Sequence, residues 1–197
     1  MIVLPKGLES IENYAFQGCG NLNDIVFPNN LKSIRDNAFS ECINITKIVL
    51  PEILENIEYQ TFSDCENLKE IVFPNCLNCI ENNAFARCCN LTEIVFPESI
   101  KSINENAFAD CSNLTKIVFP SKKITIHNNS FKRCTKLNQI MFAGDRFESF
   151  REARDMACLP QLPPNTTRIA ELTEQHNSYQ MTVRGVRTPN NTGPPRD

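Results

Sequence analysis

The chain has 197 residues, a formal net charge of -3 and a hydrophobic content of 41%. This length allows one domain with a short appendix, and the apolar content is enough for a buried core. Proteins that bind nucleic acid usually carry a basic face, so the small net charge predicts no nucleic-acid partner. No stretch approaches the about 20 apolar residues that a membrane span needs. Because the first residues also lack a secretion signal, we expect a cytoplasmic protein as the sequence stands, or a surface or secreted protein if it is a fragment.

One short apolar segment recurs every 23 residues. It reads Ile25-Val26-Phe27-Pro28 in one place and Ile48-Val49-Leu50-Pro51 one step later. A fixed period of this length is the signature of a repeat architecture, in which one unit cannot bury its own apolar face and must stack on its neighbours. Three more columns keep the same period: Phe16, Phe39, Phe62, Phe85, Phe108 and Phe131; Cys19, Cys42, Cys65, Cys88, Cys111 and Cys134; and Leu22, Ile45, Leu68, Leu91, Leu114 and Leu137.

The whole unit reads Leu-x-x-Ile-x-x-x-Ala-Phe-x-x-Cys-x-Asn-Leu-x-x-Ile-Val-Phe-Pro, and it resembles the BspA-type (treponemal-type) leucine-rich repeat over residues 1–143. The resemblance implies a β-rich, right-handed solenoid of about six repeats, with a parallel β-ladder along its concave face. It also implies protein interaction, because proteins with such repeats occur as surface adhesins and as host-interacting proteins of microbes and protists.

Alternation along each strand predicts which side chains face the core. Ile25 and Phe27 point inward and Val26 points outward, and Pro28 ends the ladder because it has no N–H to donate. The Asn that precedes each Leu is predicted to form a buried ladder that bonds to the backbone of neighbouring turns. A glycan would not fit there, so the glycosylation sequons at Asn44, Asn90 and Asn113 are interpreted as by-products of the repeat, and only those at Asn128, Asn165 and Asn190 are expected to be accessible.

The composition changes after residue 143, and we expect a helical C-terminal cap over residues 144–160. Apolar residues follow a helical period between Phe147 and Leu159, so Phe147 and Phe150 would cover the end of the stack. Residues 161–197 are expected to be a partly ordered to disordered tail. At the other end the sequence starts inside a strand, which predicts an uncovered edge unless an upstream segment or a partner covers it.

The ten cysteines divide into a repeat column of six and four residues outside it. The column is predicted to be buried thiols that pack as small hydrophobes. Cys76 and Cys79 have the spacing of half a zinc site, but a second such pair is missing and His127 and His176 are distant in sequence. A redox or zinc-dependent function of Cys76 and Cys79 is therefore the weaker alternative, and we expect no metal, no cofactor and no catalytic group.

The outward row of the ladder is the candidate site, because an apolar stripe bordered by charge is typical of interaction surfaces. The competing interpretation is that valine is simply a good strand former at a solvent-facing position. We expect a scaffold that binds a protein partner through the concave face; the alternative is an architectural spacer module of a larger protein. The predicted site comprises Val26, Val49, Val72, Val95, Val118 and Met141, with Asp24, Lys47, Glu70, Glu93, Lys116 and Gln139 beside them.

Overall fold

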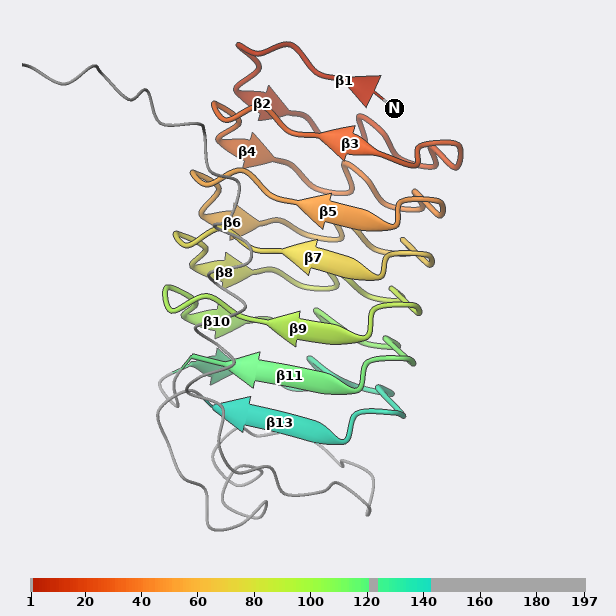
Figure 1. Ribbon diagram of the computed structural model, residues 1–197, viewed down its shortest axis with the longest axis vertical. Helices are drawn as coiled ribbons and strands as arrows, with labels where there is room; N and C mark the ends of the chain where they lie inside the picture. Colours follow the sequence, from red (N-terminus) through yellow and green to blue (C-terminus); the bar gives the residue numbers. More distant parts are fainter. Residues whose placement is uncertain (1, 121–123, 143–197) are drawn as a thin grey trace, which may run out of the picture.

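The structure is a computed structural model that describes residues 2–120 and 124–142. These residues form a stack of parallel β-solenoid turns, each 23 residues long, which confirms the fold class (Figure 1). No helix occurs among them, and the predicted cap, its helix and the tail lie outside the described residues. The strands are β1 (Ile2–Val3), β2 (Ser10–Ile11), β3 (Ile25–Val26), β4 (Ser33–Ile34), β5 (Lys47–Val49), β6 (Asn56–Ile57), β7 (Glu70–Val72), β8 (Cys79–Ile80), β9 (Glu93–Val95), β10 (Ser102–Ile103), β11 (Lys116–Phe119), β12 (Thr125–Ile126) and β13 (Gln139–Phe142).

The odd-numbered strands form the ladder that the recurring Ile-Val-Phe segment predicts. Their hydrogen-bonded sheets are β1-β3, β5-β7 and β9-β11-β13. Every paired residue lies 23 positions from its partner, as for Ile2 with Ile25 and Val49 with Val72. Ile25 and Phe27 are buried while Val26 is exposed, so the predicted alternation is confirmed.

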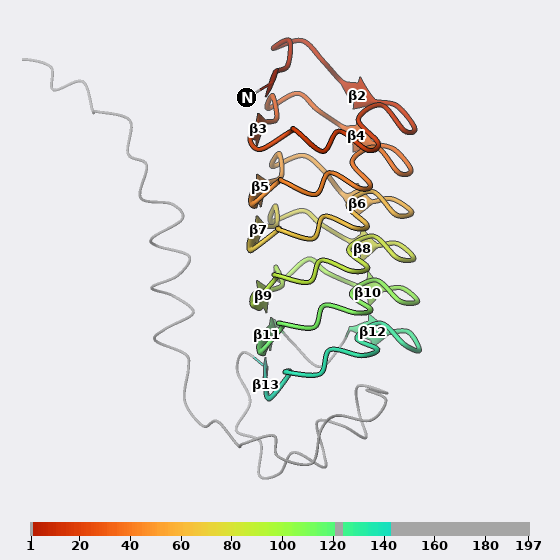
Figure 2. The same ribbon diagram turned by 90° about the vertical axis from the view of Figure 1, so that its right-hand side faces the viewer.

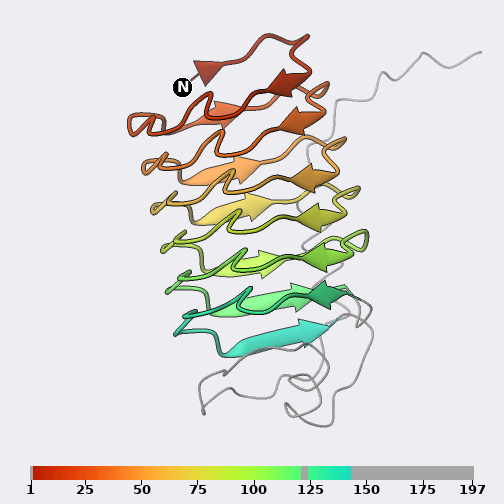
Figure 3. The same ribbon diagram turned by 180° about the vertical axis from the view of Figure 1, so that it is seen from behind.

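The even-numbered strands form a second parallel ladder, which the sequence reasoning did not predict. The sheets are β2-β4 and β6-β8-β10-β12, and they lie on a different side of the stack from the odd strands (Figures 2 and 3). Each strand has only two residues, one polar and one buried isoleucine, such as Ser33 and Ile34. The buried residues are the Ile of the Leu-x-x-Ile motif, so this motif marks a strand as well as a core position.

A third set of hydrogen bonds joins the turns through the segment that carries the core phenylalanine. The N–H of Phe39 donates to the carbonyl of Thr61 at 2.9 Å, and the N–H of Glu41 donates to that of Ser63 at 2.8 Å. Asn37 and Glu41 have positive φ angles of 56° and 62°. Asparagine adopts this left-handed conformation more readily than most residues, which accounts for its recurrence at that position. The equivalents of Asn37 are Tyr14, Gln60, Asn83, Asn106 and Asn129.

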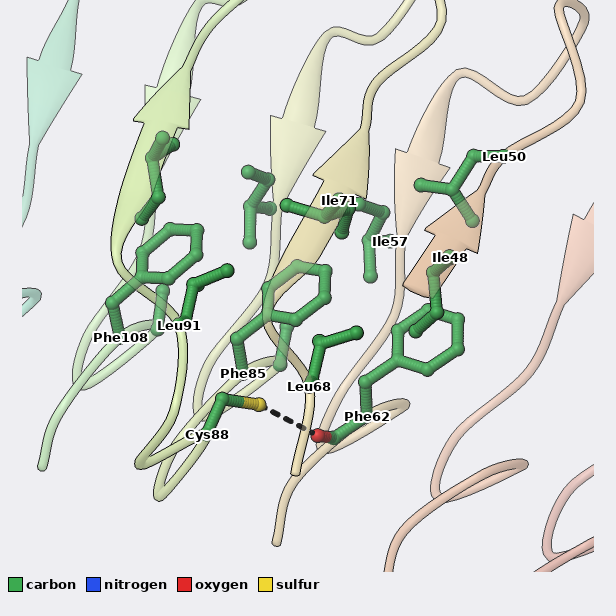
Figure 4. Packing of buried hydrophobic residues seen from close by; sticks show 14 of the residues in the cluster. Ile48, Leu50, Ile57, Phe62, Leu68, Ile71, Phe85, Cys88, Leu91 and Phe108 are labelled. Atoms are coloured by element: carbon green, nitrogen blue, oxygen red, sulfur yellow. Dashed lines mark hydrogen bonds between the residues drawn. The ribbon is translucent and has the colours of Figure 1, made fainter. Parts of the chain in front are cut away.

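Stacked aromatic rings fill the centre of the solenoid. Phe85 is fully buried, and its ring centroid lies 5.4 Å from that of Phe62 and 5.2 Å from that of Phe108 (Figure 4). A second column, from the residues directly after β7 and β9, stacks Phe73 on Phe96 at 5.6 Å and meets the first column edge-on. Identical residues one turn apart therefore contact each other, so the period in the sequence becomes a continuous core.

The repeat-column thiols are buried, as predicted, and they also make a specific hydrogen bond. The Sγ of Cys88 donates to the carbonyl of Phe62, in the preceding turn, at 3.3 Å (Figure 4). Cys42, Cys65, Cys111 and Cys134 make the same contact with the equivalent phenylalanine at 3.1 to 3.3 Å. The thiol thus donates a hydrogen bond to a backbone carbonyl of the preceding turn. An alanine side chain would fill part of the same space but has no group that could donate this bond. The nine described cysteines are all free.

The asparagine column differs from the prediction, because it is not buried. Asn44 is exposed, and Asn90 and Asn113 are only half-buried. The ladder is formed mainly between side chains: Nδ2 of Asn90 donates to Oδ1 of Asn67 at 3.1 Å, and Nδ2 of Asn113 to Oδ1 of Asn90 at 3.3 Å. Asn44 alone among these makes a bond of the predicted kind, with the backbone carbonyl of Gly20. The column lies at a corner of the solenoid, where amides can pair along the stack and still meet solvent.

Candidate functional site

The outward side of the odd strands is the surface that the sequence singled out, and we call it the ladder face. It comprises the valine row and the charged row beside it. Val26 is 67% exposed and Val49 is 51% exposed, so their side chains stand in solvent. Val3, which the sequence analysis did not include, extends the same row and is 80% exposed. Val3 and Val26 lie side by side as paired residues of β1 and β3, and Val49 occupies the equivalent position in the next turn, so the three form one apolar strip across three successive turns.

Exposure falls along the valine row from the first turns to the last. Val72 and Val95 are half-buried, and Val118 and Met141 are each only 7% exposed. Val118 and Met141 nevertheless do not belong to the hydrophobic core cluster. The surface available to a partner is therefore concentrated at Val3, Val26 and Val49, a distinction that residue type alone cannot reveal.

The charged row is neutralised in pairs across neighbouring turns. Nζ of Lys47 lies 2.7 Å from a carboxylate oxygen of Glu70, and Nζ of Lys116 lies 2.6 Å from one of Glu93. Such partly exposed pairs contribute about 0–1 kcal/mol to stability. Their more important effect is to fix the polar border of the valine row in a defined order. The two remaining residues of the predicted row, Asp24 and Gln139, flank these pairs at its two ends.

Exposed apolar side chains gather in the first turns of the solenoid beyond the ladder face as well. Ile43, Ile53 and Tyr59 were missed by the sequence reasoning, because they occur once each in columns whose other members are small or polar. Within the part of the chain that the structure describes, every large hydrophobic side chain with high exposure lies before residue 60: Val3, Tyr14, Val26, Ile43, Val49, Ile53 and Tyr59.

The even-strand face has a different character. Its outward residues are small and polar, and Oγ of Ser33 donates to Oγ of Ser10 at 2.9 Å. Carboxylates crowd beside them: partial burial, together with the nearby Asp36 and Glu81, raises the pKa of Glu58 above its usual value. This face offers little apolar area to a partner, so the ladder face is the better candidate for binding.

Ion pairs at a corner of the stack hold neighbouring turns together. The guanidinium of Arg87 contacts both carboxylate oxygens of Asp64, and that of Arg133 contacts both oxygens of Asp110 at 2.5 and 2.6 Å. The hydrogen bonds from arginine lower the pKa of Asp64 and of Asp110. Both partners of each pair belong to the same column as Glu41, whose residues have positive φ angles. The ion pairs therefore join neighbouring turns at this left-handed position.

Cys76 and Cys79 are turned toward different neighbours. Sγ of Cys76 donates to the carbonyl of Glu52, in the preceding turn, at 2.9 Å, whereas Sγ of Cys79 accepts from Oγ of Ser102, in the following turn, at 3.1 Å. Burial is the main cause that raises the pKa of both thiols. Among residues 2–120 and 124–142, no three His, Cys, Asp or Glu side chains come together as a metal site.

The thiols are expected to react with iodoacetamide in two classes. At pH 8, Cys89 should be alkylated in the folded protein while its neighbour Cys88 is not. Burial raises the pKa of both thiols, but Cys89 is only half-buried and can meet the reagent, whereas Cys88 is fully buried and its pKa is raised strongly. Cys42, whose pKa is raised to about 12, should also resist until denaturant is added. Peptide mapping by mass spectrometry measures this directly, and equal labelling of Cys88 and Cys89 in the native state would contradict the burial of the column.

The fold and the repeated face define the class of protein: a leucine-rich-repeat solenoid, built from stacked turns of equal length and register. Six copies of the BspA type leucine rich repeat region match the chain, over residues 1–115 and 57–153. The chain therefore belongs to the BspA-type leucine-rich repeat family. No curated protein sequence matches it. No described helix has the length and hydropathy needed to cross a membrane.

Solved structures share this architecture. A leucine rich repeat protein of T. pallidum is 28% identical, with a TM-score of 0.54, over 56% of this chain and 51% of its own. A leucine rich cell surface protein from Faecalibacterium prausnitzii is also 28% identical, with a TM-score of 0.65, over 78% of this chain and 39% of its own. The pneumococcal vaccine antigen PcpA, at 22% identity and a TM-score of 0.52, covers 82% of this chain and 39% of its own and shares the fold. The chain thus spans about half or less of these proteins.

Proposed function

We propose that this chain is a non-catalytic scaffold that binds a protein partner through the first turns of its ladder face. The observation that carries the proposal is the exposed strip formed by Val3, Val26 and Val49, at 80%, 67% and 51% exposure. Exposed apolar patches bordered by polar or charged residues are typical of interaction surfaces. Family membership and the likeness to a protein described as a cell surface protein support an adhesin-like or host-interacting setting.

The charged row supplies specificity in this proposal. Lys47 and Glu70 pair with each other beside the strip, and a partner with complementary groups could exchange these contacts for its own. Surface charges at the border of an interface affect the choice of partner and the association rate more than the affinity. The apolar strip would supply most of the binding free energy.

A pull-down from the native environment, with the full chain as bait, tests the proposal. The double variant Val26→Asp/Val49→Asp is expected to lose the captured partner, because two carboxylates would have to be desolvated at the centre of the interface. Ile53→Asp is the matched control, since Ile53 is 45% exposed but lies outside the ladder face. Circular dichroism should confirm that all variants remain folded.

The control decides between the two functions that the sequence left open. Loss of a partner with the double variant, and its retention with Ile53→Asp, supports binding through the ladder face. If the double variant retains every partner of the unmodified chain, the binding proposal is wrong, and an architectural spacer role of the repeat is favoured.

A further inference from the structure

We propose that Asn44 is an N-glycosylation site, the acceptor within the sequon Asn44-Ile45-Thr46. This inference is independent of the binding function proposed above. Asn44 and Thr46 are both exposed, although the asparagine column as a whole suggested a buried ladder. Ile45 between them is fully buried and anchors the segment in the core, so the acceptor amide and the hydroxyl that the sequon requires both face solvent at a fixed place.

The hydrogen bond that Asn44 makes is compatible with the modification. Nδ2 of Asn44 donates to the carbonyl of Gly20 at 2.5 Å. A side-chain amide carries two hydrogens on its nitrogen, and glycosylation replaces one of them. The remaining N–H can still donate to Gly20, so attachment of a sugar does not remove the contact between the two turns.

The surface beside Asn44 has room for a first sugar. Gly20, which Asn44 contacts, lines an open hollow of about 490 Å³ together with Gly18, and both lack side chains that would fill it. The exposed side chain of Ile43 provides an apolar wall, and Glu41 provides hydrogen-bond acceptors for sugar hydroxyls. The next turns have larger residues at the positions equivalent to these glycines, beginning with Glu41 and Ile43.

The other described sequons are less suitable in the folded protein. Asn90 and Asn113 are half-buried, and each serves as donor to one neighbouring turn and acceptor from the other. Asn128 is exposed, but Ser130 in its sequon is only 1% exposed, and its hydroxyl bonds to backbone carbonyls. The structure thus distinguishes Asn44 from sequons that have the same sequence pattern.

The reaction needs a donor of one chemical class, a lipid-linked oligosaccharide pyrophosphate. Nδ2 of Asn44 forms a bond to the anomeric carbon of the first sugar, and the bond from that carbon to the pyrophosphate oxygen breaks. The lipid pyrophosphate leaves with the bonding electron pair, and the amide nitrogen loses one proton to the transferase. No oxidant or reductant takes part.

The test is to secrete the full chain, carrying an added leader peptide, from a eukaryotic host and to map its glycopeptides. We expect a glycan on Asn44 in most of the folded, secreted protein. Chains that receive a glycan on Asn90 or Asn113 before folding should be retained and not secreted, because the sugar would disrupt the contacts of these residues with both neighbouring turns. Asn44→Gln and Thr46→Ala should each lose this glycan, whereas the matched change Thr92→Ala should leave it in place. Enzymatic removal of the glycan should leave the thermal unfolding temperature nearly unchanged.

A second measurement covers the case in which secretion itself fails. The unglycosylated full chain is incubated with a microsomal transferase and its lipid-linked donor, once folded and once denatured. Modification of Asn44 in the folded protein, with Asn90 and Asn113 modified only after denaturation, supports the proposal. Folded protein that stays unmodified at Asn44, or that carries its glycan on Asn90 or Asn113 instead, overturns it.

Discussion

Phe85→Ala is expected to lower the free energy of unfolding by about 3–5 kcal/mol. Phe85 is fully buried at the centre of the ring column and stacks on both sides, on Phe62 and Phe108, while Phe73 meets its edge. Its removal leaves a cavity between turns that backbone hydrogen bonds hold at a fixed spacing. The surrounding structure can therefore relax only slightly to fill the cavity. For this reason we expect a loss of stability near the upper end of the range seen for Phe→Ala changes in protein cores.

Urea denaturation followed by circular dichroism measures this loss of stability. Two further variants test whether it comes from ring stacking between turns. Phe16→Ala should cost clearly less, because Phe16 is half-buried and stacks on Phe39 alone, at 5.0 Å. Phe85→Leu should also cost less, because Leu50 already replaces phenylalanine in the second ring column of this chain. Equal losses for Phe16→Ala and Phe85→Ala would show that stacking between turns does not determine the stability.

The sequence predicted the odd-strand ladder because its period of alternation is visible within each repeat. It did not reveal the even strands, since two residues such as Ser33 and Ile34 are too short to show alternation. The constant spacing of the isoleucine column was the available signal, because equivalent residues of stacked turns must lie side by side. The third set of hydrogen bonds depends on positive φ at Asn37 and Glu41 and their equivalents. Recurring asparagine is a signal for this conformation in the first column, but the mixture of Glu, Asp and Arg in the second gives none.

The sequence predicted which side chains of the candidate site point outward, but not how many of them are exposed to solvent. Strand alternation correctly placed Val26 and Val49 on the outside, because successive side chains point to opposite faces. It could not separate them from Val118, which has the same residue type and register but is buried. Accessibility depends on what surrounds a position in three dimensions, so the useful part of the face emerges only from the fold. The burial of the asparagine column was misjudged for the same reason.

Ile48→Asp is expected to abolish folding at room temperature, whereas Val49→Asp should leave the fold intact. The two residues are adjacent in β5, yet Ile48 is fully buried and Val49 is 51% exposed. An aspartate at position 48 would place a carboxylate among apolar side chains with no cation to pair with it, at a cost of several kcal/mol beyond the lost apolar burial. At position 49 the same carboxylate would stay hydrated, and the change should cost about 1 kcal/mol or less, mainly through strand propensity.

Far-UV circular dichroism and thermal unfolding of the two variants at pH 7 check this pair. Ile48→Asn is the useful companion, because it removes the charge but keeps the size and polarity of the buried group. It should recover part of the lost stability, since an uncharged amide is less costly to bury than a carboxylate. If Val49→Asp unfolds the protein as completely as Ile48→Asp, the valine row is not the outer surface of the solenoid, and neither its role in binding nor the choice of Val26 and Val49 as probes would stand.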